Sequence, residues 1–71
     1  MQTMAERISW VVQDSGLTKT AFSDRLNVSQ AFISQLCSGV KTPSDRTIAD
    51  ICREFYVRED WLRTGQGQPY S

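Results

Sequence analysis

The sequence predicts an all-α protein, a compact bundle of five short helices. Three observations lead to this fold class. Apolar residues recur every three to four positions in short segments of the 71-residue chain, as they do on one face of a helix. Residues that favour helix ends, namely Ser, Thr, Asn and Gly, stand between these segments. No segment alternates apolar and polar residues for long enough to indicate a long strand, and the length suits one small domain.

The first helix is expected from about Thr3 to Asp14. Its apolar stripe consists of Met4, Ile8, Val11 and Val12. Ser15 and Gly16 follow and end the helix. Trp10 lies opposite the stripe on a helical wheel, so we expect an exposed aromatic ring that could serve as a contact site.

A second helix is expected from Lys19 to Leu26. Thr18 precedes it and can accept a hydrogen bond from an unpaired amide of the first turn. Phe22 lies four residues before Leu26, so both side chains share one face. Asn27 then interrupts the pattern, and asparagine tolerates the left-handed backbone conformation that a tight turn needs.

The third helix is expected from about Gln30 to Cys37, with Ser29 as its N-cap. Its inward-facing residues are Ile33, Leu36 and Cys37. Gly39 supplies a left-handed stop, and Pro43 prevents the following loop from continuing the helix. Two short helices joined by a tight turn, the second with a polar outer face, describe a helix-turn-helix.

Ser44 caps a fourth helix, whose core face repeats at helical spacing. The residues of this face are Ile48, Ile51, Cys52 and Phe55. Tyr56 and Val57 make a turn before a last short helix, about Glu59 to Arg63, in which Trp61 and Leu62 close the core. Residues 1–67 are thus expected to form the domain, and residues 68–71 to be a loose tail.

An ordered set of residues resembles the Cro/CI-type (XRE) family of lambda repressor-like helix-turn-helix domains. The set comprises Gly16-Leu17-Thr18, Val28-Ser29-Gln30, Ile33-Ser34, Gly39, Pro43 and the segment DWLRTGQG at residues 60–67. The resemblance runs from about Arg7 to Gly67. It implies a sequence-specific DNA-binding transcriptional regulator of phage or prophage type. In this family an arginine and a glutamate often pair at the positions of Val12 and Cys37, and here packing replaces that ion pair.

The outer face of the third helix carries the predicted base contacts. A glutamine amide can bond both N6 and N7 of adenine in the major groove. Gln30 and Gln35 match base-reading positions of similar repressors, although a solvated face is the simpler alternative for two exposed glutamines. Ala31 and Phe32 could touch a thymine methyl, and Ser34 could reach a base. The predicted phosphate contacts are Lys19, Thr20, Ser29, Lys41 and Thr42.

The charge balance is neutral, with eight basic and eight acidic residues, whereas a nucleic-acid binder is expected to be basic. Residues 15–43 nevertheless carry three basic side chains and one acidic side chain. The mild positive excess therefore lies on the helix-turn-helix, and we expect binding that weakens with salt.

The sequence offers little catalytic chemistry. It has no histidine, no CxxC pair and no glycine-rich phosphate loop, so we expect neither an enzyme nor a bound metal or cofactor. Cys37 and Cys52 are expected to be small buried apolar residues. No apolar run is long enough to span a membrane and no secretory signal precedes the first helix, which predicts a cytoplasmic protein.

We expect a weak homodimer on a pseudo-palindromic operator, because so small a domain with few basic residues cannot hold one half-site tightly. Its contact would use Val40, Phe32, Tyr56 and Trp61, in the loop and C-terminal region that similar repressors use. An alternative is a protein–protein interaction module with Trp10 and Phe32 as anchors. A third possibility is that the domain belongs to a longer chain.

Overall fold

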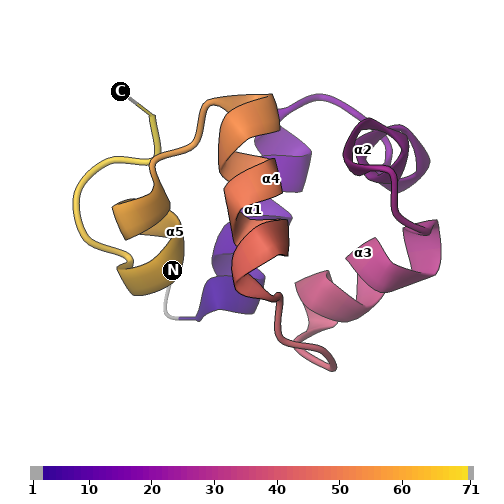
Figure 1. Cartoon of the computed structure of the whole chain (residues 1–71), viewed down its shortest axis with the longest axis horizontal. Coiled ribbons are helices and arrows are strands. Elements are labelled where there is room, and N and C mark those ends of the chain that lie inside the picture. Colours follow the sequence, from indigo (N-terminus) through magenta and orange to yellow (C-terminus); the bar gives the residue numbers. More distant parts are fainter. Residues whose placement is uncertain (1–2, 71) are drawn as a thin grey trace.

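The computed structural model describes residues 3–70 and confirms the expected all-α fold (Figure 1). The five helices are α1 (Met4–Asp14), α2 (Lys19–Leu26), α3 (Gln30–Ser38), α4 (Asp45–Phe55) and α5 (Glu59–Thr64). Within residues 3–70, β pairing is limited to one isolated antiparallel bridge between Val57 and Tyr70. None of the helices in this range is long and apolar enough to cross a membrane.

Side-chain caps explain where four of the five helices, α1 to α4, begin. The hydroxyls of Thr18, Ser29 and Ser44 each accept a hydrogen bond at 3.1–3.2 Å from the amide three residues further on. Thr3 and Glu6 form a reciprocal capping box at the start of α1. These bonds satisfy amides that have no partner inside the helix, and the sequence predicted three of the four caps.

Left-handed residues explain where four of the five helices end, including α5, which Gly65 (φ 82°) closes. Asn27 (φ 58°) closes α2 and Gly39 (φ 83°) closes α3, both as expected. Tyr56 closes α4 in the same conformation (φ 59°), although a side chain with a Cβ makes this geometry less favourable. The left-handed residue therefore turns the chain out of the helix at a single position, and the connections after α2 and α4 are only three residues long.

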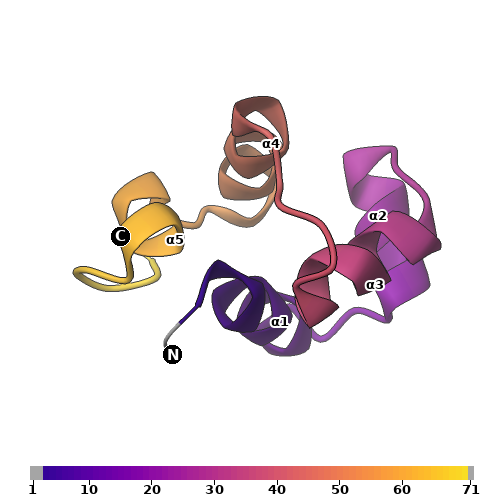
Figure 2. The same cartoon turned by 90° about the horizontal axis from the view of Figure 1, so that it is seen from below.

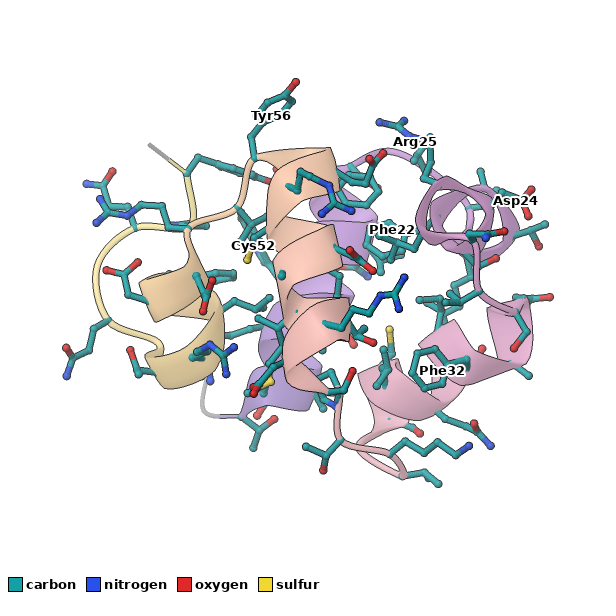
Figure 3. All side chains as sticks on the ribbon, viewed as in Figure 1. Phe22, Asp24, Arg25, Phe32, Cys52 and Tyr56 are labelled. Carbon is teal, nitrogen blue, oxygen red and sulfur yellow. The ribbon has the colours of Figure 1, made fainter. Side chains whose placement is uncertain are left out.

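The helices enclose one core. α1 and α4 lie in the middle, α2 and α3 lie on one side and α5 on the other, in both views (Figures 1 and 2). Phe22 of α2 stacks on Phe55 of α4 with ring centroids 4.3 Å apart and planes 4° from parallel, and Figure 3 shows Phe22 between these two helices. The buried apolar residues are Ile8, Val11, Val12, Phe22, Leu26, Ile33, Leu36, Ile48, Ile51, Val57, Trp61 and Leu62.

Trp10 differs from the expectation of an exposed aromatic. Its ring is half-buried and lies 5.5 Å from that of Trp61 in an edge-on arrangement. The ring of Tyr70 covers it from a second direction at 5.8 Å. A helical wheel of α1 alone placed Trp10 opposite the core, because the wheel contains neither α5 nor the C-terminal segment that packs there.

The segment 68–70 is correspondingly not loose, while Ser71, the last residue of the expected tail, lies outside the described residues. The carbonyl of Pro69 accepts a hydrogen bond from the amide of Arg58 at 2.8 Å. The hydroxyl of Tyr70 donates to Asp14 at 2.6 Å. Burial, and then this hydrogen bond to a carboxylate, raise the pKa of Tyr70 to about 12. The chain therefore folds back and joins the end of α1 to the turn before α5.

Arg7 is a buried residue that the sequence did not indicate. It is 5 % exposed, and its guanidinium donates hydrogen bonds to the carbonyls of Leu62 at 2.8 Å and Arg63 at 3.1 Å. These carbonyls lie in the last turn of α5, where carbonyls have no intrahelical partner and a positive charge is favourable. A Cβ on Gly65 would lie 3.1 Å from the Arg7 guanidinium, so the glycine leaves room for this contact.

Candidate nucleic-acid interface

The outer face of α3 carries the four residues predicted to contact bases. Gln30 and Ala31 are exposed, and Ser34 and Gln35 are half-exposed. Ile33 and Leu36, on the opposite face, are fully buried and hold α3 on the core. The outer side of α3 is free of other helices at the bottom of Figure 1, and this side faces the reader in Figure 2.

The turn between α2 and α3 fixes how α3 is presented. The amide of Val28 donates to the carbonyl of Ser23 at 3.0 Å, which closes the turn after Asn27. Ser23 itself is 1 % exposed, and its hydroxyl donates to the carbonyl of Thr20 at 2.7 Å. A small side chain with its own hydrogen bond lets the two helices approach closely without an unpaired polar atom.

The residues predicted to contact phosphates come before and after the outer face of α3 in the sequence, and all are exposed. Lys19 and Thr20 are exposed in the first turn of α2, and Lys41 and Thr42 are exposed in the loop after α3. Ser29 is exposed at the start of α3, where its hydroxyl oxygen accepts the capping bond. That oxygen still carries a hydrogen, so Ser29 can cap the helix and donate to an anion at once.

Most arginines on the described surface are neutralised by ion pairs with carboxylates, and a few of its cations are left unpaired. The paired side chains are Arg25–Glu54, Arg53–Asp50, Arg58–Asp60 and Arg63 with both Asp45 and Glu59. Among the exposed cations of residues 3–70, Lys19, Lys41 and Arg46 have no carboxylate within 4.0 Å. Neutral net charge therefore coexists with unpaired positive charge around the helix-turn-helix.

Arg46 is a candidate phosphate contact that the sequence analysis missed. It lies in the first turn of α4 and lines a groove beside Asn27 and Val28 of the turn between α2 and α3. The neighbouring Asp45 concealed it in the sequence, because the two charges cancel there. In the structure Asp45 pairs instead with Arg63 at 3.0 Å, which leaves Arg46 free.

Comparison with known proteins identifies the family. The helix-turn-helix family profile matches residues 8–62, more than half of the chain. The chain belongs to the Cro/CI-type helix-turn-helix family. Over 68 residues the chain is 35% identical to two curated proteins. One is the HTH-type transcriptional regulator for conjugative element SXT, from Vibrio cholerae, and the other is the HTH-type transcriptional regulator for conjugative element pMERPH, from Shewanella putrefaciens. The match covers 96% of the chain but only 31% of each of these relatives.

A solved structure shares the fold. The P22 c2 repressor, crystallised in complex with synthetic operator 9T in the presence of Tl+, superimposes with a TM-score of 0.84. The two chains are 23% identical, and the superposition covers 93% of this chain and 100% of the repressor chain. The likeness confirms the lambda repressor-like fold of this helix-turn-helix domain.

The four residues predicted for a dimer contact do not form one surface of the domain. Val40 is 72% exposed and Tyr56 is 81% exposed, but they lie at opposite ends of α4, an 11-residue helix about 16 Å long. Figure 3 shows Tyr56 pointing away from the domain, whereas the loop that contains Val40 leads into the other end of α4. Phe32 is half-buried. Trp61 is only 4% exposed, so its place in such a contact is corrected: it belongs to the core, which it was also expected to close.

The cysteines pack against the core of the helix-turn-helix domain. Cys37 and Cys52 are both free and half-buried. Burial raises the pKa of the Cys52 thiol, and the negative charge of Glu59 raises it further, so the thiol form is favoured. Within residues 3–70, no group of three or more Cys, Asp or Glu side chains is arranged to hold a metal ion.

Proposed function

We propose that this domain is the DNA-binding part of a transcriptional regulator and that α3 reads the major groove. The observation that carries the proposal is the arrangement around α3. Gln30 and Gln35 stand on its outer face, and the unpaired cations Lys19 and Lys41 lie before and after it in the chain. The similarity to regulators of conjugative elements and to a repressor crystallised with an operator supports the same conclusion.

The chemistry divides between sequence readout and positioning. A glutamine amide presents a donor and an acceptor that match N7 and N6 of adenine, while Ala31 can meet a thymine methyl and Ser34 can bond a base edge. The cations and the first-turn amides of α2 would hold phosphates and fix the register of α3 without reading sequence.

Binding of a random duplex of about 20 base pairs tests DNA binding itself. Three cations on phosphates give a slope of about −2.7 in log affinity against log salt, or about a 40-fold loss between about 50 and 200 mM salt. We expect Lys19→Gln to reduce the slope by about 0.9, and the matched control Arg58→Gln to leave it unchanged, because Arg58 already pairs with Asp60 at 3.3 Å. A chain that does not bind the duplex at low salt would refute the proposal and favour the protein-interaction alternative.

We further propose that the domain acts as a weak homodimer that DNA strengthens, with Val40 in the contact. Val40 is an exposed apolar side chain in a loop, and it has no core to enter. Two copies reading half-sites about 34 Å apart would reach an affinity that one small domain cannot.

Sedimentation at rising concentration, with and without a duplex selected for tight binding, tests the dimer. Val40→Asp should weaken self-association and remove cooperative binding to a palindromic site, while Val40→Ala should have a smaller effect. A strict monomer that fills both half-sites independently, whatever stands at position 40, would end this proposal.

A further inference from the structure

The ring of Phe32 and the ammonium of Lys41 lie together at the edge of α3. The Lys41 Nζ is 5.9 Å from the centroid of the Phe32 ring. Phe32 is half-buried against the core, whereas Lys41 is exposed. Figure 3 shows Phe32 on the ribbon of α3. An aromatic face attracts a cation within about 6 Å, so this geometry gives Lys41 one preferred place for its charge.

The backbone brings the two residues together. Gly39 ends α3 in the left-handed conformation, which turns the chain back along the helix. The amide of Lys41 then donates to the carbonyl of Gln35 at 3.2 Å. Lys41 is consequently anchored to the same helix that carries Phe32, and in the described part of the chain no carboxylate within 4.0 Å competes for its ammonium.

The position of Phe32 on the helix separates it from Ala31 and Ser34, whereas Gln35, three residues further on, lies only about 60° from it. Successive residues of an α-helix are about 100° apart, so Phe32 points about 100° away from Ala31, toward the flank of the outer face. At this flank the ring can restrict the position of the Lys41 side chain, whereas Ala31 and Ser34 face outward, toward the major groove of bound DNA. This geometry differs from the roles that the sequence suggested for Phe32, a thymine contact or a dimer contact.

We propose that Phe32 is a positioning residue, which holds the Lys41 ammonium at the edge of α3 where it meets a DNA phosphate. The inference rests on the proposed function and names a part of the same site. A lysine side chain free in solution samples many rotamers, and the ring restricts them before DNA arrives. Because a phosphate contact carries no sequence information, Phe32 should strengthen binding to all duplexes alike.

The free protein provides the first test, which needs no DNA. In the nuclear magnetic resonance spectrum, the ring should shift the Cε protons of Lys41 upfield from their position in an unstructured chain. We expect Phe32→Leu to abolish this shift and Phe32→Tyr to retain it, with circular dichroism confirming that both variants fold. A Lys41 shift that is the same in the unchanged protein and in Phe32→Leu would overturn the inference.

A double-mutant cycle on a random duplex provides the second test. Phe32→Leu should weaken binding about two- to fivefold, and Phe32→Tyr should restore most of the loss. Lys41→Gln should reduce the salt slope by about 0.9, and adding Phe32→Leu to Lys41→Gln should cause no further loss. The control Arg58→Gln should leave the effect of Phe32→Leu intact.

The outcomes separate this inference from the proposed function. If the unchanged protein does not bind the duplex, the proposed function fails and the inference fails with it. If it binds but the losses from Phe32→Leu and Lys41→Gln add, the inference alone is overturned. A change of base preference in Phe32→Leu would likewise overturn it and assign Phe32 to a thymine contact.

Discussion

Replacing Arg7 with methionine should strongly destabilise the domain. The guanidinium is buried and joins α1 to the last turn of α5 through the carbonyls of Leu62 and Arg63. Methionine can fill the space of the aliphatic part of the side chain but cannot donate to either carbonyl. The last turn of α5 would then keep two acceptors without their partner, and Gly65 would face an unfilled gap.

The magnitude follows from these two bonds. A hydrogen bond to a charged group contributes about 1.5–3 kcal/mol to stability. The variant loses two such bonds, but it no longer has to bury a charge, and this offsets part of the loss. We therefore expect a loss of about 2–4 kcal/mol for Arg7→Met. Since a domain of this size has a free energy of unfolding of about 4–10 kcal/mol, such a loss removes a large part of its stability. The melting temperature should fall by about 10–30 °C.

Urea unfolding measures this loss, followed by far-ultraviolet circular dichroism and by tryptophan fluorescence. Trp61 lies in the same helix as the acceptors of Arg7, so its fluorescence reports on the region directly. Arg53→Met is the matched control, because Arg53 is exposed and its pair with Asp50 should contribute at most about 1 kcal/mol. A loss below about 0.5 kcal/mol for Arg7→Met would refute the role assigned to Arg7.

Three further predictions concern Tyr70, Val12 and Cys37. The folded state raises the pKa of Tyr70 from 10.0 to about 12, so the neutral phenol stabilises the fold fully below about pH 10, and this contribution is lost as the pH rises toward 12. The midpoint of urea unfolding should therefore fall over this range, and it should fall less in Tyr70→Phe. Val12→Arg should cost about 3–5 kcal/mol by burying an unpaired charge, and adding Cys37→Glu should recover part of it; a double variant no more stable than Val12→Arg would count against their proximity. Cys37 should also react slowly with thiol reagents in the folded protein, and rapid labelling without denaturant would contradict its packing against the core.

The sequence predicted the parts of the fold that depend on neighbouring residues. Caps such as Thr18, Ser29 and Ser44, and the left-handed ends at Asn27 and Gly39, act within one or two turns, so local chemistry was enough to place them. Arg7 could not be found in this way, because arginine is usually exposed and the carbonyl of Leu62 lies 55 residues further along the chain.

The candidate site shows the same division. The outer face of α3 follows from helical periodicity, and the structure leaves its two glutamines accessible. The free charge of Arg46 depends on Asp45 pairing with Arg63 of α5. The cover over Trp10 depends on Tyr70, which no helical wheel of α1 includes. These features arise from tertiary contacts, and no local sequence pattern predicts them.

Selection of preferred sites from a pool of random duplexes, carried out in parallel with the unchanged protein and with Gln30→Ala and Gln35→Ala, tests the central claim most directly. If α3 reads the major groove, each variant should lose its preference at one base pair, at a cost of about 1–3 kcal/mol, and keep the rest of the site. Both variants should fold normally, since neither glutamine belongs to the buried core. Recovery of the same site with equal strength by all three proteins would contradict the claim that these glutamines read bases.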